Sequence, residues 1–286
     1  MALEQDERSG PRVGDRSSRI LGGSGGARSP AVAAVSTVVV FGVLVLIVVN
    51  SPNWEEVKEQ FFNWRVFKNS FPDIAEAFKT NVKLFLTAEV FILVLALFLA
   101  VLRSLPGPVF FPLRVLSTAY TDVFRGIPTI LLVYLLGFGV PGLQLSGVPN
   151  SQFFWAAVAL VLVYSAYVAE VYRAGIESIH PSQAAAARSL GLTHAQSMRY
   201  VVLPQAVRRV IPPLLNDFIG LQKDTALVAL LGVVEAFRQS QIESAGAFNH
   251  TPYLATALLF LLLTIPLTRF TDWLIARNRR RELARA

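Results

Sequence analysis

The sequence predicts an all-α membrane protein: a bundle of about six transmembrane helices with a short cytoplasmic helix–turn–helix loop. Hydrophobic residues make up 53% of the 286 residues, charged residues only 16%, and the mean hydropathy is +0.51. This composition is typical of polytopic membrane proteins. Apolar runs long enough to cross a hydrocarbon core of ~30 Å recur along the chain, and the arginines gather between and beyond them.

The first 80 residues divide into a tail, an anchor and a surface segment. Residues 1–30 are rich in Gly, Ser and Arg and predict a disordered, basic cytoplasmic tail. Residues 31–49 predict an extra N-terminal transmembrane anchor. They are too long for a signal peptide, and Ile47-Val48-Val49 offers no small-residue cleavage site. Residues 50–80 carry several aromatic side chains and predict an extracytoplasmic or interfacial segment.

The remaining five spans fall within residues 81–277, the predicted transmembrane domain. Clean apolar runs cover 84–102, 153–169 and 254–275. Two further spans are more polar: one runs from about 116 through 129–140, and the other over about 207–221. Pro128, Pro212 and Pro213 predict kinks in spans that line a cavity. Residues 278–286 predict a second basic cytoplasmic tail.

The charge distribution predicts that both termini are cytoplasmic. Arginines precede the first span, follow the last and surround residues 173–209, whereas the connection over 141–152 carries no charge. This is the pattern of the positive-inside rule. The segment over 50–83 departs from the pattern, because it lies outside in this topology yet holds five Lys and Arg residues beside five acidic ones.

Several kinds of chemistry are excluded by composition and spacing. The chain has no cysteine, so it forms no disulfide and no thiolate metal site, and its three histidines lack metal-ligand spacing. The glycine-rich stretch over 22–26 lacks the Lys-Ser/Thr pair of a phosphate-binding loop. We therefore expect no metal site and no ATP hydrolysis by this chain.

A polar, basic segment over about 173–205 interrupts the apolar runs. Pro181 suits the first turn of a helix, and Gly191 suits the position just past its end. Thr193 and Gln196 form a capping box that starts a second helix, and Pro204 is expected to end it. Two short helices joined at Gly191 form a docking shape. A DNA-reading helix–turn–helix has a similar outline, but spans on both sides exclude it.

Several motifs then carry a family resemblance. Gly191 is followed after nine residues by Val201-Val202-Leu203-Pro204, and Arg125-Gly126-Ile127-Pro128 and Glu170-Val171-Tyr172-Arg173-Ala174-Gly175 lie upstream. Over roughly residues 81–277 the chain resembles permease subunits of ABC importers, in the polar amino acid uptake family with the type I importer fold. It departs from the family at Ala185, where a Glu is usual, and at Ser182-Gln183, where Gly-Gln is common.

The resemblance implies a set of partners. The loop would fit a groove on a cytoplasmic ABC ATPase dimer, which would bind ATP and Mg²⁺, so no cofactor is expected in this chain. A second permease subunit, identical or related, would complete the translocation path, and an extracytoplasmic solute-binding protein would deliver substrate. Membrane lipid is expected around the spans, and nucleic acid is not expected as a partner.

Two groups of candidate site residues follow. The residues expected to dock the ATPase and couple it to transport are Ala185, Ala186, Arg188, Leu190, Gly191, Ala195, Met198, Leu203 and Pro204. The alternative for the apolar members Ala186, Leu190, Ala195 and Met198 is that they only pack the two short helices together.

The second group consists of polar residues at membrane depth, which are costly there and usually face a cavity or a partner. Arg125 is a candidate for the substrate carboxylate, and Glu170, Asp217 or Asp224 for its ammonium group. Asn216, Lys223 and Thr225 are expected to shape a gate or the subunit contact. The alternative is that these groups pair with one another and hold helix positions, which is also the interpretation we prefer for Glu89.

The sequence therefore predicts a multi-pass plasma-membrane permease subunit of an ATP-driven, binding-protein-dependent importer for polar amino acids, and not an enzyme. The alternative is a stand-alone secondary transporter or channel that uses its intramembrane charges as an ion relay. The helical loop favours the importer, because a self-sufficient transporter has no need of a docking loop between spans.

Overall fold

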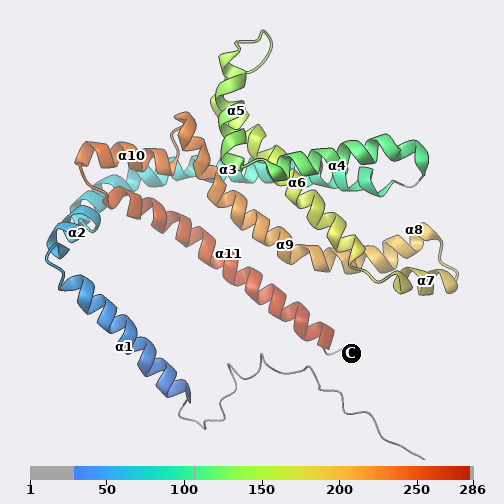
Figure 1. The fold of residues 1–286 in the computed structure, drawn as a ribbon, viewed down its shortest axis with the longest axis horizontal. Coiled ribbons are helices and arrows are strands. Elements are labelled where there is room, and N and C mark those ends of the chain that lie inside the picture. The colour runs from blue at the N-terminus through green and yellow to red at the C-terminus, as the bar shows by residue number, and fades with distance from the viewer. Residues whose placement is uncertain (1–28, 106, 284–286) are drawn as a thin grey trace, which may run out of the picture. The chain divides into compact units, whose positions relative to one another are not determined.

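A computed structural model describes residues 29–105 and 107–283, and every regular element in these ranges is helical (Figure 1). This confirms the predicted all-α class. The α-helices are α1 Ser29–Val49, α2 Trp54–Phe61, α3 Trp64–Ser104, α4 Phe111–Gly126, α5 Thr129–Gly142, α6 Gln152–Glu177, α7 Pro181–Ser189, α8 His194–Ser197, α9 Leu203–Asp224, α10 Ala236–Ala247 and α11 Thr251–Leu283. Three shorter elements are the 3-10 helices η1 Pro108–Phe110 and η3 Thr225–Leu231 and the π-helix η2 Met198–Val202.

The chain forms two compact units, Met1–Lys58 and Glu59–Ala286. In the first unit, α1 coincides with the predicted anchor, and its side chains from Val32 to Val49 are all exposed. A helix that is apolar on every side and exposed suits a lipid environment. The predicted tail over residues 1–30 lies outside the described residues except for its last two.

The core of the second unit is built around α6. Small and branched side chains of α6 are fully buried against α3, α5 and α9, among them Ala159, Leu160 and Val163. Ile92 of α3 and Val133 of α5 lie in the same core. Small residues at regular spacing let helices of a membrane bundle approach closely, so α6 becomes the central helix of the bundle.

A buried polar network joins the half of α3 that precedes this core to α10. The Asn81 side chain donates to Thr225 Oγ1 at 3.1 Å and to Glu235 Oε2 at 2.8 Å, and its own carbonyl oxygen accepts from Ala236 N at 3.0 Å. Glu235 is fully buried and caps α10 by accepting from Arg238 N at 2.7 Å. Because a buried carboxylate is stable only when hydrogen-bonded, this network fixes the position of α10 on α3.

The predicted surface segment over residues 50–80 does not end at residue 80, because a helix runs through that position. α3 begins at Trp64 after the N-cap Asn63 and continues unbroken to Ser104, so residues 64–80 form the first part of that helix. This part packs through Ile74 against α10 and α11. Its predicted position at the outer membrane surface stays a prediction.

The predicted number of six spans is not confirmed by length and composition. Among the described residues, four helices meet those criteria, namely α1, α3, α6 and α11, and the bent pair formed by α4 and α5 gives up to five. α9 covers the remaining predicted span and has 22 residues, enough for ~33 Å at 1.5 Å per residue. It falls short in hydropathy because it carries charged residues and three prolines.

The span predicted over residues 116–140 is sharply bent. α4 and α5 meet at 99° across the break at Ile127 and Pro128 (Figure 1). Ile127 is extended, with ψ 130°, as expected for a residue before proline. Pro128 therefore breaks this span as predicted, whereas Pro212 and Pro213 lie within α9 without ending it.

The prediction that Pro204 ends the second short helix is wrong. α8 passes directly into η2, and α9 begins at Leu203 with Pro204 in its first turn. Proline is tolerated there because the first N–H groups of a helix need no partner within it. The preceding π-helical turn at Met198–Val202 keeps the chain helical from the loop into α9.

Candidate functional site

The helical loop, defined as α7, α8 and η2 (residues 181–202), is shaped by local capping. His180 caps α7 by accepting from Ser182 N at 3.2 Å. The predicted capping box of Thr193 and Gln196 is present at the start of α8. Gly191 lies between the two helices with φ +87°, a backbone conformation that favours glycine, so the predicted turn is confirmed.

Most of the apolar candidates on the loop point away from the protein. Ala185, Ala186 and Ala195 are exposed, and Leu190 is 86% exposed. Met198 is partly buried and packs on a small cluster at the base of the loop. The contacts therefore divide the group: Met198 packs the loop, whereas the three alanines and Leu190 leave an apolar surface open.

The remaining candidates on and beside the loop are also accessible. Arg188 is exposed at the end of α7, and Leu203 and Pro204 are exposed in the first turn of α9. Together with Leu190, the last two form an apolar part of a loop surface that also exposes polar side chains and the cations Arg188 and Arg199. Because the family's usual Glu is replaced by Ala185, this surface presents no carboxylate at that position.

The loop is fixed to the ends of α6 and α9. Ile179, Val202 and Ala206 form a buried cluster beneath it. Gly175 of α6 lies so close to Val210 of α9 that a Cβ atom at Gly175 would overlap Val210 Cγ1. The loop and these two helix ends therefore form one packed block.

The loop is also tied by polar contacts. The Arg209 guanidinium donates to the backbone oxygen of Ser178 just after α6. Ser197 Oγ donates to Ala184 O at 3.4 Å, linking α8 to α7.

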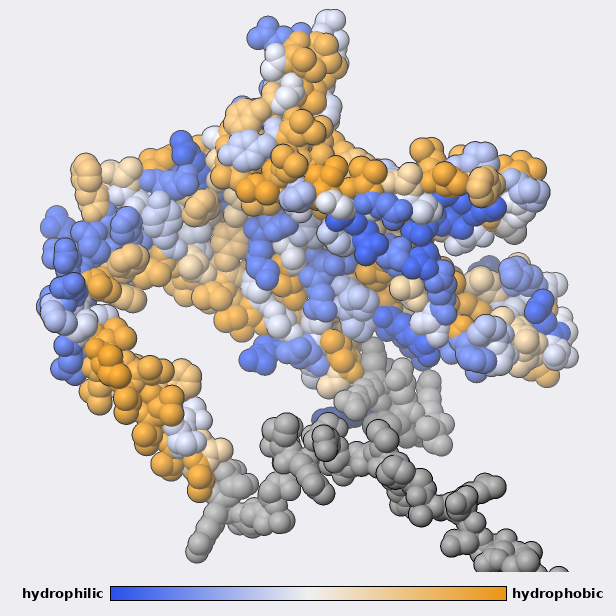
Figure 2. Space-filling model, viewed as in Figure 1, coloured by the Kyte–Doolittle hydropathy of each residue, from blue (hydrophilic) through white to orange (hydrophobic). Residues whose placement is uncertain are grey.

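Figure 2 shows hydrophilic side chains gathered between α4 and α7, whereas α5 is mainly hydrophobic.

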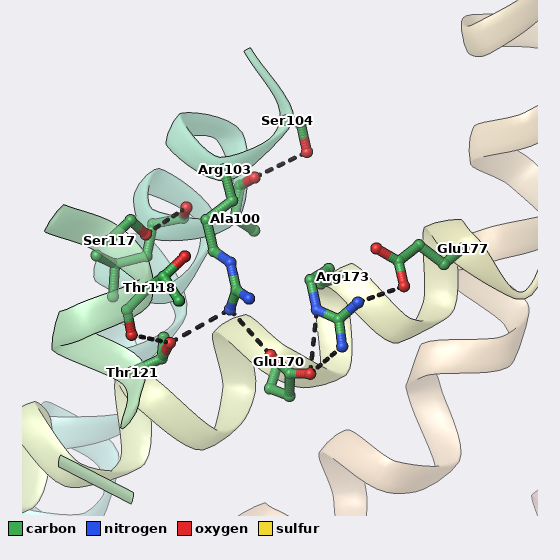
Figure 3. A network of polar contacts seen from close by, with 10 residues as sticks. Ala100, Arg103, Ser104, Ser117, Thr118, Thr121, Glu170, Arg173 and Glu177 are labelled. Carbon is green, nitrogen blue, oxygen red and sulfur yellow. Dashed lines mark hydrogen bonds and ion pairs between the residues drawn. The ribbon is translucent and has the colours of Figure 1, made fainter. Parts of the chain in front are cut away.

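Glu170 lies at the centre of a charged network between helices (Figure 3). Its Oε2 accepts from Arg103 Nη1 at 2.9 Å, and its Oε1 accepts from Arg173 Nε at 3.0 Å. Arg103 also donates to Thr121 of α4 at 3.3 Å, and Arg173 pairs with Glu177. Both oxygens of this candidate ammonium partner are thus bonded to arginines.

Arg125 lies in the last turn of α4, beside the bend to α5. Its side chain is exposed, and the guanidinium carbon lies 5.7 Å from the ring centroid of Tyr167 on α6. Tyr167 Oη also donates to the Arg125 backbone oxygen at 3.4 Å. The ring holds the cation beside α6 while its N–H groups stay accessible.

The carboxylates of α9 differ in their surroundings. Asp224 Oδ2 accepts from Tyr164 Oη at 2.9 Å. Asp217 has one buried oxygen, Oδ2, with no hydrogen-bond partner among the described residues. Lone buried acceptors are uncommon in folded proteins, so Asp217 is the candidate carboxylate with free bonding capacity. Glu89 on α3 lies within electrostatic reach of Asp217 on α9 and of Tyr172 on α6, and its role as an interhelical polar contact stays a prediction.

The three candidates for a gate or subunit contact lie in contrasting places. Asn216 and Lys223 are exposed on α9. Thr225 is fully buried and belongs to the network of Asn81 and Glu235. Thr225 therefore links η3 to α3 and has a structural position in the fold.

Sequence reasoning did not select Arg103, Asn81 or Glu235 as site residues. Each has a signal in the sequence, because a charged or amide side chain next to or within an apolar run must find a partner. The partners themselves lie far along the chain: Arg103 and Glu170 are 67 residues apart, and Asn81 and Glu235 are 154 apart. Across the described residues, no group of three His, Cys, Asp or Glu side chains could hold a metal ion.

The helical bundle, with a short helical loop packed on the ends of α6 and α9, is consistent with a membrane-embedded subunit of a transport system. The family model described as "Binding-protein-dependent transport system inner membrane component" matches residues 93–280. The chain belongs to this family. It is therefore a multi-pass inner-membrane transport subunit whose systems include an ATPase and a substrate-binding partner, and ATP hydrolysis belongs to the separate ATPase.

Individual relatives agree with this assignment. The chain is 34% identical over 204 residues to the probable amino-acid permease protein YxeN of Bacillus subtilis, covering 71% of this chain and 90% of that protein. It is 38% identical over 187 residues to the probable glutamine ABC transporter permease protein GlnM of the same organism, covering 64% and 83%.

A solved structure shares the fold. The crystal structure of an amino acid ABC transporter with histidines aligns with a TM-score of 0.65 and 31% identity, over 72% of this chain and 94% of that one. About a quarter of this chain therefore has no counterpart there.

Proposed function

We propose that this chain is one permease half of an ATP-driven importer for polar amino acids. Its relatives are named as amino-acid and glutamine permeases, which supports this substrate class. A second permease, identical or related, would complete the path. Cytoplasmic ATPases would bind ATP and Mg²⁺, and an extracytoplasmic binding protein would deliver the amino acid.

The observation that carries this proposal is the helical loop. Leu190 is 86% exposed beside the exposed Ala185 and Ala186, and an exposed apolar surface on a rigid support is typical of a protein–protein contact. The loop is packed on both α6 and α9. A push on the loop by a docked ATPase would therefore tilt the ends of two membrane helices together.

The orientation that fits this role has the loop and both termini in the cytoplasm. α9 leaves the loop and lies along α6, since Gly175 contacts Val210 near the loop and Gly220 approaches Tyr164 further along both helices. In the proposed arrangement α9 returns across the membrane as a span of its own. With α9 counted, the described helices give an even number of crossings.

For the substrate, we assign Arg125 to the carboxylate and Asp217 to the ammonium group. Arg125 has accessible N–H groups beside Tyr167, and Asp217 has an oxygen without a partner among the described residues. Glu170 is held by two arginines and Asp224 by Tyr164, so both are weaker candidates. Asn216 and Lys223 are accessible for a gate or a subunit contact.

The test is ATP-driven uptake by the complex of this permease, its ATPase and its binding protein in lipid vesicles, with labelled amino acids supplied to the binding protein. Gly191→Val should abolish most uptake. The φ of +87° at Gly191 costs a side-chain-bearing residue roughly 1–2 kcal/mol and more when it is β-branched, so the angle between α7 and α8 would change.

Gly246→Val in α10 is the matched control, because an added Cβ meets no neighbour at either glycine but Gly246 has an ordinary helical backbone. We expect the control to insert, retain the ATPase on purification and transport normally. Normal uptake by a well-expressed Gly191→Val permease would show that the loop does not couple ATP hydrolysis to transport.

A further inference from the structure

The helical loop is packed into a larger block. Its base is packed through Ile179, Val202 and Ala206, and Gly175 contacts Val210 without space for another atom. We define the loop block as residues 175–210. Because its parts are close-packed, a force on the loop displaces the end of α6 as a unit.

α4 is attached to the rest of the bundle both by packing of Tyr120 and Phe124 against the hydrophobic core and by a small set of polar contacts. Its two fully buried side chains are Ser117 and Thr121. Ser117 Oγ donates to Leu99 O of α3 at 3.0 Å, and Tyr120 Oη donates to Leu162 O of α6 at 3.0 Å. These hydrogen bonds are directional, so they fix the register of α4 against α3 and α6 in addition to the apolar packing.

Glu170 connects these two parts of the molecule. It lies on α6 five residues before the loop block, and Arg103 bridges it to Thr121 of α4 through bonds of 2.9 and 3.3 Å from one nitrogen. The Arg103 and Glu170 side chains are only 17% and 22% exposed. Partial shielding from water makes this pair stronger than a surface salt bridge.

We propose that Glu170 is a positioning residue which, through Arg103 and Thr121, transmits movement of the loop block to α4. This rests on the proposed docking of an ATPase on the loop. α4 leads directly into the 99° bend before α5, where Arg125 lies. The Glu170 connection would thus carry the ATP-driven movement from the loop to the candidate substrate site.

Arg103→Gln tests the connection in the reconstituted complex. It removes the ion pair but leaves the loop block intact, so ATPase retention and ATP hydrolysis should stay at wild-type levels. Uptake per ATP hydrolysed should fall about tenfold, a change typical of coupling between sites. Arg103→Lys keeps the charge next to Glu170 but loses the planar fork, and its uptake per ATP should be intermediate.

Arg114→Gln is the matched control. Like Arg103→Gln on α3, it removes one positive charge, here from α4, but Arg114 donates to Leu105 O at 2.7 Å and to Gly107 O at 2.8 Å, within the turn between α3 and α4. We expect its uptake per ATP to change less than about twofold, since its bonds hold a turn and not the contact with α6.

A distance measurement separates coupling from simple support. The chain has no cysteine, so Val115→Cys on α4 and Arg208→Cys on the loop block, both at exposed positions, can carry one pair of spin labels in each copy of the chain. With an intact connection the distance between the labels should stay constant when ATP is added. With Arg103→Gln it should change, because the loop block moves without α4.

Three outcomes would overturn the inference: unchanged uptake per ATP in Arg103→Gln, an unchanged label distance in that variant on ATP addition, or a loss of uptake matched by an equal loss of assembled complex. Absence of ATP-driven uptake in the wild-type complex would instead refute the proposed function. The two failures are therefore distinguishable.

Discussion

At the scale of single residues, the environment of each candidate decides which chemistry it can perform. Glu170 and Asp217 are both acidic residues at membrane depth, and the sequence treats them alike. Glu170 is bonded to Arg103 and Arg173, whereas Asp217 keeps a buried oxygen without a partner among the described residues. The first is suited to joining helices, and the second to receiving a cationic group.

Arg125 provides a prediction at this scale. Arg125→Lys keeps the charge but loses the planar fork that grips two carboxylate oxygens. We expect the apparent affinity of the membrane step to weaken about tenfold, equivalent to ~1.4 kcal/mol, while basal ATP hydrolysis and complex yield persist. The measurement is ATPase stimulation against the concentration of loaded binding protein.

Tyr167→Phe is the control for Arg125. It keeps the ring beneath the guanidinium and removes only the bond from Tyr167 Oη to the Arg125 backbone oxygen, so affinity should change less than about twofold. Reduced complex yield with an unaltered concentration dependence in Arg125→Lys would exclude a substrate role and assign Arg125 to helix positioning.

At the scale of helices, close approach between α6 and α9 builds the support for the loop. Gly175 faces Val210, and Gly220 lies where a Cβ atom would be 3.2 Å from Tyr164 Oη. Small residues at these points bring the two backbones together. The same contact explains why α9 is part of the bundle despite its low hydropathy.

This packing predicts the outcome of a pair of substitutions. Gly175→Ala places a methyl group against Val210 Cγ1, and β-branched valine cannot rotate freely away. We expect a loss of roughly 1–3 kcal/mol of stability, seen as a lower thermal unfolding midpoint of the purified permease. Val210→Ala in the same chain should restore most of that loss.

The control for this pair is Gly246→Ala, where an added Cβ meets no neighbour. Because alanine favours the helix more than glycine does, its midpoint should equal or exceed that of the wild type. A double variant Gly175→Ala with Val210→Ala that is no more stable than Gly175→Ala alone would contradict the packing account.

At the scale of the whole molecule, charge and crossing number together predict topology. Arginines lie before α1, around the helical loop and in the last turns of α11. Reporter fusions after Pro30 and after Ala286 should therefore both report the cytoplasm, because the positive-inside rule places these segments there. A reporter inserted at the exposed Gly147, between α5 and α6, should report the opposite side.

These fusions also decide the number of spans. Termini on opposite sides of the membrane would mean that one predicted span does not cross, and α9 would be the first to question because of its polar composition. Termini on the same side with Gly147 opposite would support six crossings, including α1 and α9.

The sequence by itself determines the helical class, the transport family and the shape of the loop. These properties are local: apolar runs specify membrane helices, and Pro181, Gly191 and the capping box of Thr193 and Gln196 direct the backbone through neighbouring residues. The π-helical passage of η2 into α9 escaped prediction, because proline is equally suited to following a helix and to starting one.

Only the tertiary structure decides which polar residues meet. The partners of Glu170 and Asn81 lie on helices far along the chain, and no spacing rule brings them together. The 99° bend between α4 and α5 and the packing of Met198 beneath the loop likewise depend on the neighbouring helices. Two polar side chains can bond only if their helices approach closely at the right level. Close contacts elsewhere in the bundle, such as that of Gly175 with Val210, set how the helices approach one another.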